Sequence, residues 1–337
     1  MRVSSSLVAL AAVGCLAPSP PVGPDRDPQS ESRLKALVGQ LTAEDAEVAL
    51  EARQKLEGMG PEVVPVLFEK LLEADWTLCP RLLEVLSANG REFAKEKLLT
   101  GNDTERIYAA LAYELTRGGQ PDDYDTREFK AMVQALLEAI KSDDKYLRAA
   151  AGLALVYDPD SAVWFEHFHE IVPVLISSFD TELQIERGGF PEPRDVPFLA
   201  ISILLDTYIG DRLAYHQLKP TIDERMRQVL PGGARCQRER ALALAGARAE
   251  IEDLRTYWQE WWENHATLDS RQIGAKIIDR NLRILETHDG DTRSTSPRWC
   301  AERSLELWTG TTRSSKEGWG RWWNTHRVDY SGPLRRP

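Results

Sequence analysis

The sequence has few of the residues that most often carry chemistry. Its 337 residues include four cysteines, six histidines and four methionines. No G-x-S-x-G, Walker A, G-x-G-x-x-G or H-E-x-x-H pattern occurs, and no cysteine or histidine pair has the spacing of a zinc site. Carboxylates are plentiful, but no pair is marked as a general acid and base. These absences predict a protein that is not an enzyme and that carries no cofactor and no metal.

One histidine-rich stretch, Glu166–Glu170, is a candidate for metal binding. On a helix, residues i and i+2 project about 200° apart, so the imidazoles of His167 and His169 cannot reach one ion. The acidic stretches Asp122–Asp125 and His288–Asp291 lack the ligand set of a calcium loop. We interpret them as one amphipathic helix and two solvated turns.

Long hydrophobic runs are scarce as well. The run Leu7–Val13 is far shorter than the ~20 apolar residues that a membrane-spanning helix needs. It is typical of the hydrophobic region of a signal peptide, which we assign to residues 1–15. The end of this segment, Ala12–Cys15, resembles the lipobox of bacterial lipoproteins, in which the cysteine is diacylated. The resemblance implies lipidation of Cys15, and Leu16 after it implies the outer membrane.

Residues 16–32 are rich in proline, serine and aspartate, which predicts a disordered tether between an anchor and a folded domain. We therefore expect an exported outer-membrane lipoprotein that faces the periplasm or the cell surface. The alternative is a secreted protein that loses Cys15 with its signal peptide.

Three cysteines remain after Cys15. In an oxidising compartment, one disulfide and one buried free thiol are the natural arrangement. Cys236 and Cys300 each stand ten residues before a glycine in two similar segments, which favours a bond between them. A disulfide requires Cα atoms within about 7 Å. Equivalent positions on packed helices can instead be ~10 Å apart, so the pairing stays open.

From residue 33 onward the apolar residues recur at helical spacing. Between Leu34 and Leu41 they fall at i, i+3, i+4 and i+7, and a longer stripe runs from Phe129 to Ile140 behind a predicted N-cap at Thr126. No stretch alternates with period two, so we predict an all-α chain without a sheet. Short breaks with turn chemistry occur at Met59–Pro61, Ser87–Gly90, Thr100–Asp103 and Asp158–Asp160.

The helices also recur as a unit. Val64–Leu67 returns as Val172–Leu175 and, in a variant form, as Val196–Leu199, with proline expected near a helix start in each. Asp103–Leu111 is similar to Asp144–Leu153, and the arginines of these two stretches lie 42 residues apart, within the repeat length of HEAT and armadillo proteins.

Residues 43–209 resemble HEAT-repeat proteins through these motifs. The resemblance implies a HEAT-like α-solenoid of stacked helical hairpins over residues 33–209, with alanines that allow close packing. It also implies a non-catalytic scaffold that holds a protein partner on the solenoid surface. The segment 188–195, rich in glycine and proline, is expected to form a long loop.

The region 210–337 is rich in tryptophan and arginine and contains a duplication. Trp258, Trp261 and Trp262 form one W-x-x-WW segment, and Trp319, Trp322 and Trp323 form another. At 100° per residue the three rings of a segment share an arc of about 100°, so each segment is predicted to be a helix with its tryptophans in the core. Leu305–Gly310 together with the second segment resembles part of some bacterial extracytoplasmic HEAT-repeat proteins.

Charge divides the chain into two parts. The net charge is −11, which argues against a nucleic-acid partner. Residues 1–210 carry a net −15 and residues 211–337 a net +4, with 19 arginines among the 22 basic residues of the second part. Tryptophan stacks on sugars and arginine pairs with phosphates or carboxylates. An alternative function is therefore an envelope module that binds glycans or anionic surfaces through residues 210–337.

Overall fold

The structure is all-helical, as the hydrophobic periodicity predicts. The computed structural model describes residues 28–43, 45–76, 78–117, 126–156, 163–181, 184–185, 194–195, 248–287, 297–312 and 315–333. Within these ranges the chain consists of helices joined by turns, with one pair of two-residue strands. No helix in the described ranges is long and apolar enough to cross a membrane.

The first helices are short and follow one another closely along the chain. They are α1 (Pro28–Gln40), α2 (Ala46–Glu57), the 3-10 turn η1 (Pro61–Val63), α3 (Val64–Glu73), α4 (Cys79–Asn89), α5 (Arg91–Thr100), α6 (Asp103–Arg117), α7 (Arg127–Ala139) and α8 (Lys145–Leu155). The predicted breaks at Met59–Pro61, Ser87–Gly90 and Thr100–Asp103 separate α2 from α3, α4 from α5, and α5 from α6. The predicted turn Asp158–Asp160 lies outside the described residues.

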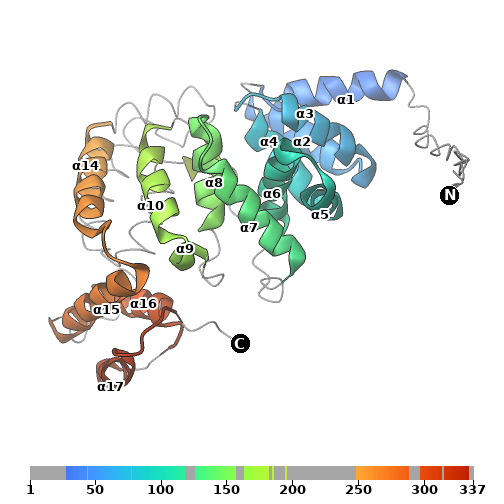
Figure 1. The fold of residues 1–337 in the computed structure, drawn as a ribbon. Helices are drawn as coiled ribbons and strands as arrows, with labels where there is room; N and C mark the ends of the chain where they lie inside the picture. Colours follow the sequence, from blue (N-terminus) through green and yellow to red (C-terminus); the bar gives the residue numbers. More distant parts are fainter. Residues whose placement is uncertain are drawn as a thin grey trace, which may run out of the picture.

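The later helices lie in two groups. The first comprises α9 (Val163–Glu166), α10 (Phe168–Ser177) and the 3-10 turn η4 (Ser178–Asp180), and the second comprises α14 (Arg248–His265), α15 (Ser270–Thr287), α16 (Pro297–Thr309) and α17 (Lys316–His326). Figure 1 shows the chain advancing from α1 at one end of the molecule through α7, α8 and α10 to α14 at the other, with α15, α16 and α17 grouped beside the lower end of α14.

Local sequence explains where several helices begin. The Thr126 hydroxyl accepts a hydrogen bond from the Phe129 N–H, which confirms the predicted cap of α7. Asp144 caps α8 through two backbone N–H groups, and Ser315 caps α17. Pro28 opens α1, so residues 28–32 of the predicted tether are helical. Proline is favoured at this position because its missing N–H has no helical partner there.

The predicted position of Pro173 at a helix start is wrong. Pro173 lies inside α10, which begins at Phe168 after a break at His167. Proline cannot donate to the helix ladder and therefore disfavours this position. The apolar residues around it, Ile171, Val172 and Leu175, are fully buried. Their burial outweighs the local preference, as tertiary packing often does.

The expected absence of a sheet fails at one place. β1 (Gln184–Ile185) pairs antiparallel with β2 (Arg194–Asp195). The two strands flank the predicted loop and include its last two residues. A two-residue strand is too short to show the alternation by which strands are recognised in a sequence.

Each of the first helices packs on its neighbours in sequence. α1 packs on α2, α3 on α4, α5 on α6, and α7 on α8, and α2, α4, α6, α8 and α10 are also in contact in succession. Polar links join successive pairs as well, because Arg53 of α2 pairs with the buried Glu84 of α4 and the Asn89 amide donates to the Glu57 carbonyl. Each pair of successive helices is thus in contact with the pair next to it along the chain.

Small residues bring α8 and α10 close together. Ala149, Ala150, Ala151 and Gly152 are all buried in α8. A Cβ atom added to Gly152 would lie 2.8 Å from the Val174 side chain of α10. The alanine-rich run therefore allows close packing of the next helix, as predicted.

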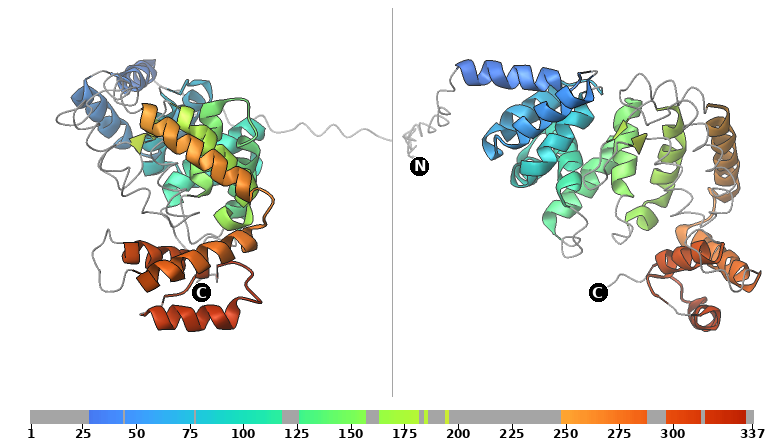
Figure 2. Two further views of the ribbon diagram at one scale, coloured as in Figure 1. Left: turned by 90° about the vertical axis from the view of Figure 1, so that its left-hand side faces the viewer. Right: turned by 180° about the vertical axis from the view of Figure 1, so that it is seen from behind.

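Aromatic side chains join the C-terminal helices to the rest of the chain. Trp308 of α16 packs edge-on against Trp164 of α9, with ring centroids 4.9 Å apart, and both side chains are fully buried. Phe168 of α10 contacts Trp261 and Trp262 of α14. In the side and rear views of Figure 2, α14 lies alongside α10, and α15 to α17 form a compact group next to it. The buried apolar residues of both parts belong to one core.

Candidate functional site

The first Trp segment, residues 258–265, lies in α14 and faces α10. Trp258 is fully buried, whereas Trp261 and Trp262 are half-buried against the core. The Trp262 ring contacts Phe168 and His169 at centroid distances of 5.5 and 5.7 Å. The polar residues between and around the tryptophans, Gln259, Glu260 and Glu263, are exposed. The three rings therefore lie on the packed side of an amphipathic helix.

The second Trp segment, residues 319–326, lies in α17 and faces α15. All three of its tryptophans are buried. The Trp323 indole N–H donates to the Asp279 carboxylate of α15 at 2.7 Å, and the Tyr330 ring packs edge-on against Trp323. The segment follows Gly310, which ends α16 with a positive φ of 65° and donates to the Glu306 carbonyl. Glycine is favoured at such a helix end because it adopts a positive φ without strain. Gly246, the equivalent residue before the first Trp segment, lies outside the described residues.

Both Trp segments carry the same stacked tryptophan–histidine pair. His265 stacks on Trp261 with centroids 4.4 Å apart, and His326 stacks on Trp322 at 4.6 Å. In each pair the histidine Nδ1 lies 2.7 Å from the carbonyl oxygen of the same tryptophan. A carbonyl oxygen can only accept a hydrogen bond, so Nδ1 of each histidine carries a proton and donates it to this bond. The duplication thus extends from the sequence W-x-x-WW-x-x-H to its side-chain geometry.

The buried tryptophans leave little aromatic surface for a ligand. All ten tryptophans of the chain lie among the described residues, and each is buried or half-buried. The indole nitrogens of Trp258, Trp308 and Trp319 are buried without a hydrogen-bond partner among the described residues. Tryptophans in sugar-binding sites present a ring face and their N–H group to solvent or ligand. The Trp segments here act as core.

The Trp-rich helices hold α15 closely. A Cβ atom added to Gly274 of α15 would lie 2.7 Å from the Tyr330 hydroxyl and 2.9 Å from the Trp308 ring. The Tyr330 hydroxyl donates to the Trp308 carbonyl at 2.7 Å, and burial raises the pKa of this phenol above its usual range. Asn281 of α15 donates to the Ser304 hydroxyl of α16. One side of α15 is therefore fixed by α16, α17 and Tyr330.

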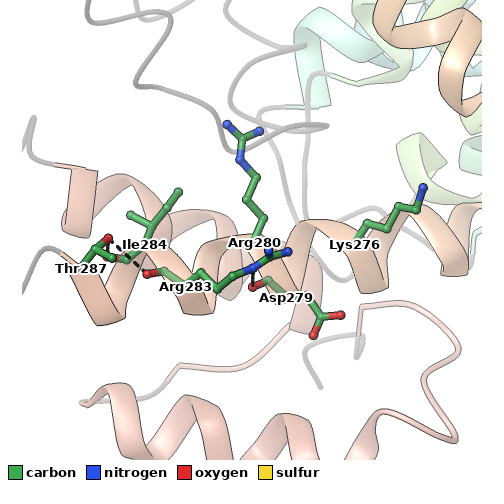
Figure 3. Close-up of a pocket in the computed structure, with 6 residues that line it drawn as sticks. All are labelled: Lys276, Asp279, Arg280, Arg283, Ile284 and Thr287. Atoms are coloured by element: carbon green, nitrogen blue, oxygen red, sulfur yellow. Dashed lines mark hydrogen bonds between the residues drawn. The ribbon is translucent and has the colours of Figure 1, made fainter.

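A hollow of about 570 Å³ lies on another side of α15. It is lined by Lys276, Asp279, Arg280, Arg283, Ile284 and Thr287. At 100° per residue, the three basic side chains leave the helix within an arc of about 60°. Figure 3 shows Lys276 and Arg280 projecting to the same side of α15 and Asp279 pointing away from them. We call this surface the basic hollow.

Asp279, the one carboxylate among the described residues of the basic hollow, already has partners. The Asp279 carboxylate accepts from the Trp323 indole at one oxygen and from Arg327 at the other, both at 2.7 Å. The Arg283 Nε donates to the Asp279 backbone carbonyl at 3.3 Å. Asp279 therefore compensates Arg327, which is not part of the lining. Lys276 and Arg283, which are exposed, add positive charge to the described lining.

The other residues singled out in the sequence do not form a site. His167 lies between two helices, 3.6 Å from Glu170, and His169 packs on Trp262. Within the described ranges, no group of three histidine, cysteine or acidic residues could hold a metal ion. Cys15 and Cys236 lie outside the described residues, as does the side chain of Cys300, so the proposed lipidation and disulfide remain predictions.

Cys79 is a buried free thiol at the start of α4. Desolvation, together with the nearby carboxylates of Asp75 and Asp144, raises its pKa to about 12. The reactive form of cysteine is the thiolate. At neutral pH this cysteine is therefore a protonated core residue and not a nucleophile.

The basic hollow was not predicted from the sequence. Its signal is present in the sequence, because Lys276, Arg280 and Arg283 follow one another at i, i+4 and i+7. Such spacing also describes an ordinary solvated helix face. The difference depends on which side of α15 is covered by α16 and α17, and this information is not local to the helix.

Comparisons with known proteins give no family for this chain. No protein-family description, no curated protein and no solved structure matches it.

Proposed function

We propose that the chain is a non-catalytic interaction protein, in which HEAT-like helical hairpins form a solenoid that holds a protein partner. The packing order of the helices supports this proposal. The second helices of successive hairpins, α2, α4, α6 and α8, contact one another in turn, as repeats in a solenoid contact only their neighbours. Stacks of this kind offer extended surfaces whose residues come from several repeats.

Photo-crosslinking in the native host tests this function. One set of probes is placed at the exposed positions Glu69, Glu96 and Gln134 of α3, α5 and α7, and the other at Gln54, Thr104 and Lys145 of α2, α6 and α8. A solenoid that holds a partner on one surface gives the same crosslinked protein from at least two helices of one set and none from the other set. No specific product from either set, or equal products from both, would contradict the proposal.

We further propose that the chain is exported and anchored in the outer membrane through a lipid on Cys15. The apolar run Leu7–Val13 and the lipobox-like Ala12–Cys15 support this address. Metabolic labelling with a fatty acid is expected to mark the wild type and not Cys15→Ser. Labelling that survives the substitution would rule out this anchor.

A second candidate function is the binding of an anionic ligand by the C-terminal helices. The observation that favours it is the basic hollow, where three basic side chains share the lining with one carboxylate that is already paired. Because the tryptophans are buried, we expect the ligand to be held by charged side chains and not by stacking on aromatic rings. Binding of glycans by ring stacking would require a tryptophan exposed on the surface.

A further inference from the structure

We propose that the basic hollow on α15 binds a soluble oligoanion, a ligand that carries at least two carboxylate or phosphate groups. This inference rests on the second candidate function and names its site and ligand chemistry. Three properties of the hollow support it: the spacing of its positive charges, the surroundings of these charges and the size of the hollow.

The spacing of the basic residues calls for more than one anionic group. Lys276, Arg280 and Arg283 form a row whose ends lie seven residues apart on the helix, a rise of about 10 Å. One carboxylate or phosphate can contact one or two neighbouring cations, but it cannot reach both ends of this row. A ligand with two anionic groups about 5–10 Å apart along its length matches the spacing of the row.

The surroundings leave the ends of the row available. Lys276 and Arg283 are exposed. Among the described residues of the lining, the one acidic side chain is Asp279, and it is bound by Trp323 and Arg327. Arginine offers a planar fork of donors that fits carboxylates and phosphates, and lysine offers a mobile point charge. A lysine and an arginine together can therefore bind carboxylate groups or phosphate groups.

The size of the hollow fits a small ligand. Its volume of about 570 Å³ lies within the range of small-molecule sites, and it is widely open to solvent. Ile284 and Thr287 add an apolar contact and a hydroxyl to the described lining.

Isothermal titration at low ionic strength tests the proposal with the full chain. Tetragalacturonate supplies the carboxylate probe, tripolyphosphate the phosphate probe, and maltotetraose a neutral control. We expect the wild type to bind at least one of the two anionic probes, to bind it more weakly as salt is raised, and not to bind maltotetraose. The anionic probe that binds more tightly identifies the preferred group.

Two double variants with the same net charge separate the site from general attraction. Lys276→Gln with Arg283→Gln removes both ends of the row. Lys141→Gln with Arg271→Gln is the matched control, because both of its residues are exposed and Arg271 projects about 180° away from Arg280 on α15. We expect the hollow variant to bind about three- to thirtyfold more weakly, as loss of two exposed charge contacts predicts, and the control to bind within about twofold of wild type.

Three results would overturn the proposal. The first is the absence of binding to both anionic probes, and the second is equal weakening in both double variants. The third is binding to vesicles with anionic lipids but to neither soluble probe, which would assign the charge to a membrane surface. None of these results bears on the protein-binding solenoid, which depends on the crosslinking pattern. Circular dichroism of both variants verifies that they are folded.

Discussion

The two Trp segments have the same residue pattern and the same tryptophan–histidine stack, yet they are buried to different depths. The second and third tryptophans of the first segment are half-buried on α14, whereas those of the second segment are buried on α17. α14 packs on α10 and the adjoining turn η4, while α17 packs on α15 and is closed by Tyr330.

This difference separates what a helix determines by itself from what its neighbours add. The register of the rings and the stack between i and i+4 depend only on helical geometry, and they are the same in both segments. The depth of burial and the Asp279 acceptor of Trp323 depend on α15. A motif of this kind therefore specifies which side of the helix is packed, and the fold specifies how completely.

The largest expected effect comes from the first tryptophan of each segment, since both are fully buried. Trp258→Ala and Trp319→Ala are each expected to lower the free energy of unfolding by about 3–5 kcal/mol, the usual range for a buried tryptophan. Trp261→Ala is the matched control and is expected to cost about 1–2 kcal/mol, because its ring is only half-buried. Chemical denaturation measures all three variants. A loss for Trp261→Ala equal to that for Trp258→Ala would break the comparison.

Substitutions of two glycines, one in α15 and one in α17, test how closely the neighbours of the second Trp segment are packed. Gly274→Ala places a methyl group within 3 Å of Tyr330 and Trp308, and we expect it to cost about 1–3 kcal/mol, as overpacking usually does. Gly320→Ala in α17 meets nothing within 4 Å and should stabilise by about 0.5–1 kcal/mol through helix propensity. Thermal or chemical denaturation of the two variants compares them directly. Similar effects of the two substitutions would mean that Tyr330 and Trp308 do not pack against Gly274.

Substitution of Asp279 tests the contribution of α15, which packs on the second Trp segment and not on the first. Asp279→Ala leaves the Trp323 N–H without its acceptor and Arg327 without its partner, and we expect a loss of about 1–2 kcal/mol. Asp279→Asn retains a carbonyl oxygen for the indole and is expected to cost less. The measurement is chemical denaturation of both variants in the wild-type and Trp323→Phe backgrounds. An unchanged penalty for Asp279→Ala in the Trp323→Phe background would show that the indole bond contributes nothing.

The smallest effect concerns the feature that both segments share. His265→Ala and His326→Ala each remove one ring stacked on a tryptophan, and aromatic pairs contribute about 0.5–1.5 kcal/mol. Both stacks have nearly the same separation and angle, so we expect similar losses. Denaturation curves that differ by more than about 1 kcal/mol between the two variants would show that the neighbours also determine the stack.

Much of the local structure could be predicted from the sequence. The stripe Phe129–Ile140, the cap at Thr126 and the break at Gly310 depend on residues close together in the chain, and the structure has all three. Helical periodicity and capping are local properties, so a single sequence carries them.

The remaining features depend on contacts between distant segments. Pro173 lies within a helix because the residues around it are buried. The two-residue strands β1 and β2 are too short to leave a pattern. The basic hollow exists because α16 and α17 cover one side of α15 and leave Lys276 and Arg283 exposed. None of these contacts has a signature in the residues next to it.

Acrylamide quenching of tryptophan fluorescence tests the central claim most directly, because it reports all ten rings together and none of them is exposed. The claim is that the tryptophans belong to the hydrophobic core and that a ligand binds the basic side chains of α15. The account predicts that acrylamide quenches the native protein several-fold less than the unfolded protein, and that tetragalacturonate or tripolyphosphate leaves the native emission unchanged. Native quenching equal to that of the unfolded chain, or an emission shift on adding tetragalacturonate, would contradict it by showing that the rings form the binding surface.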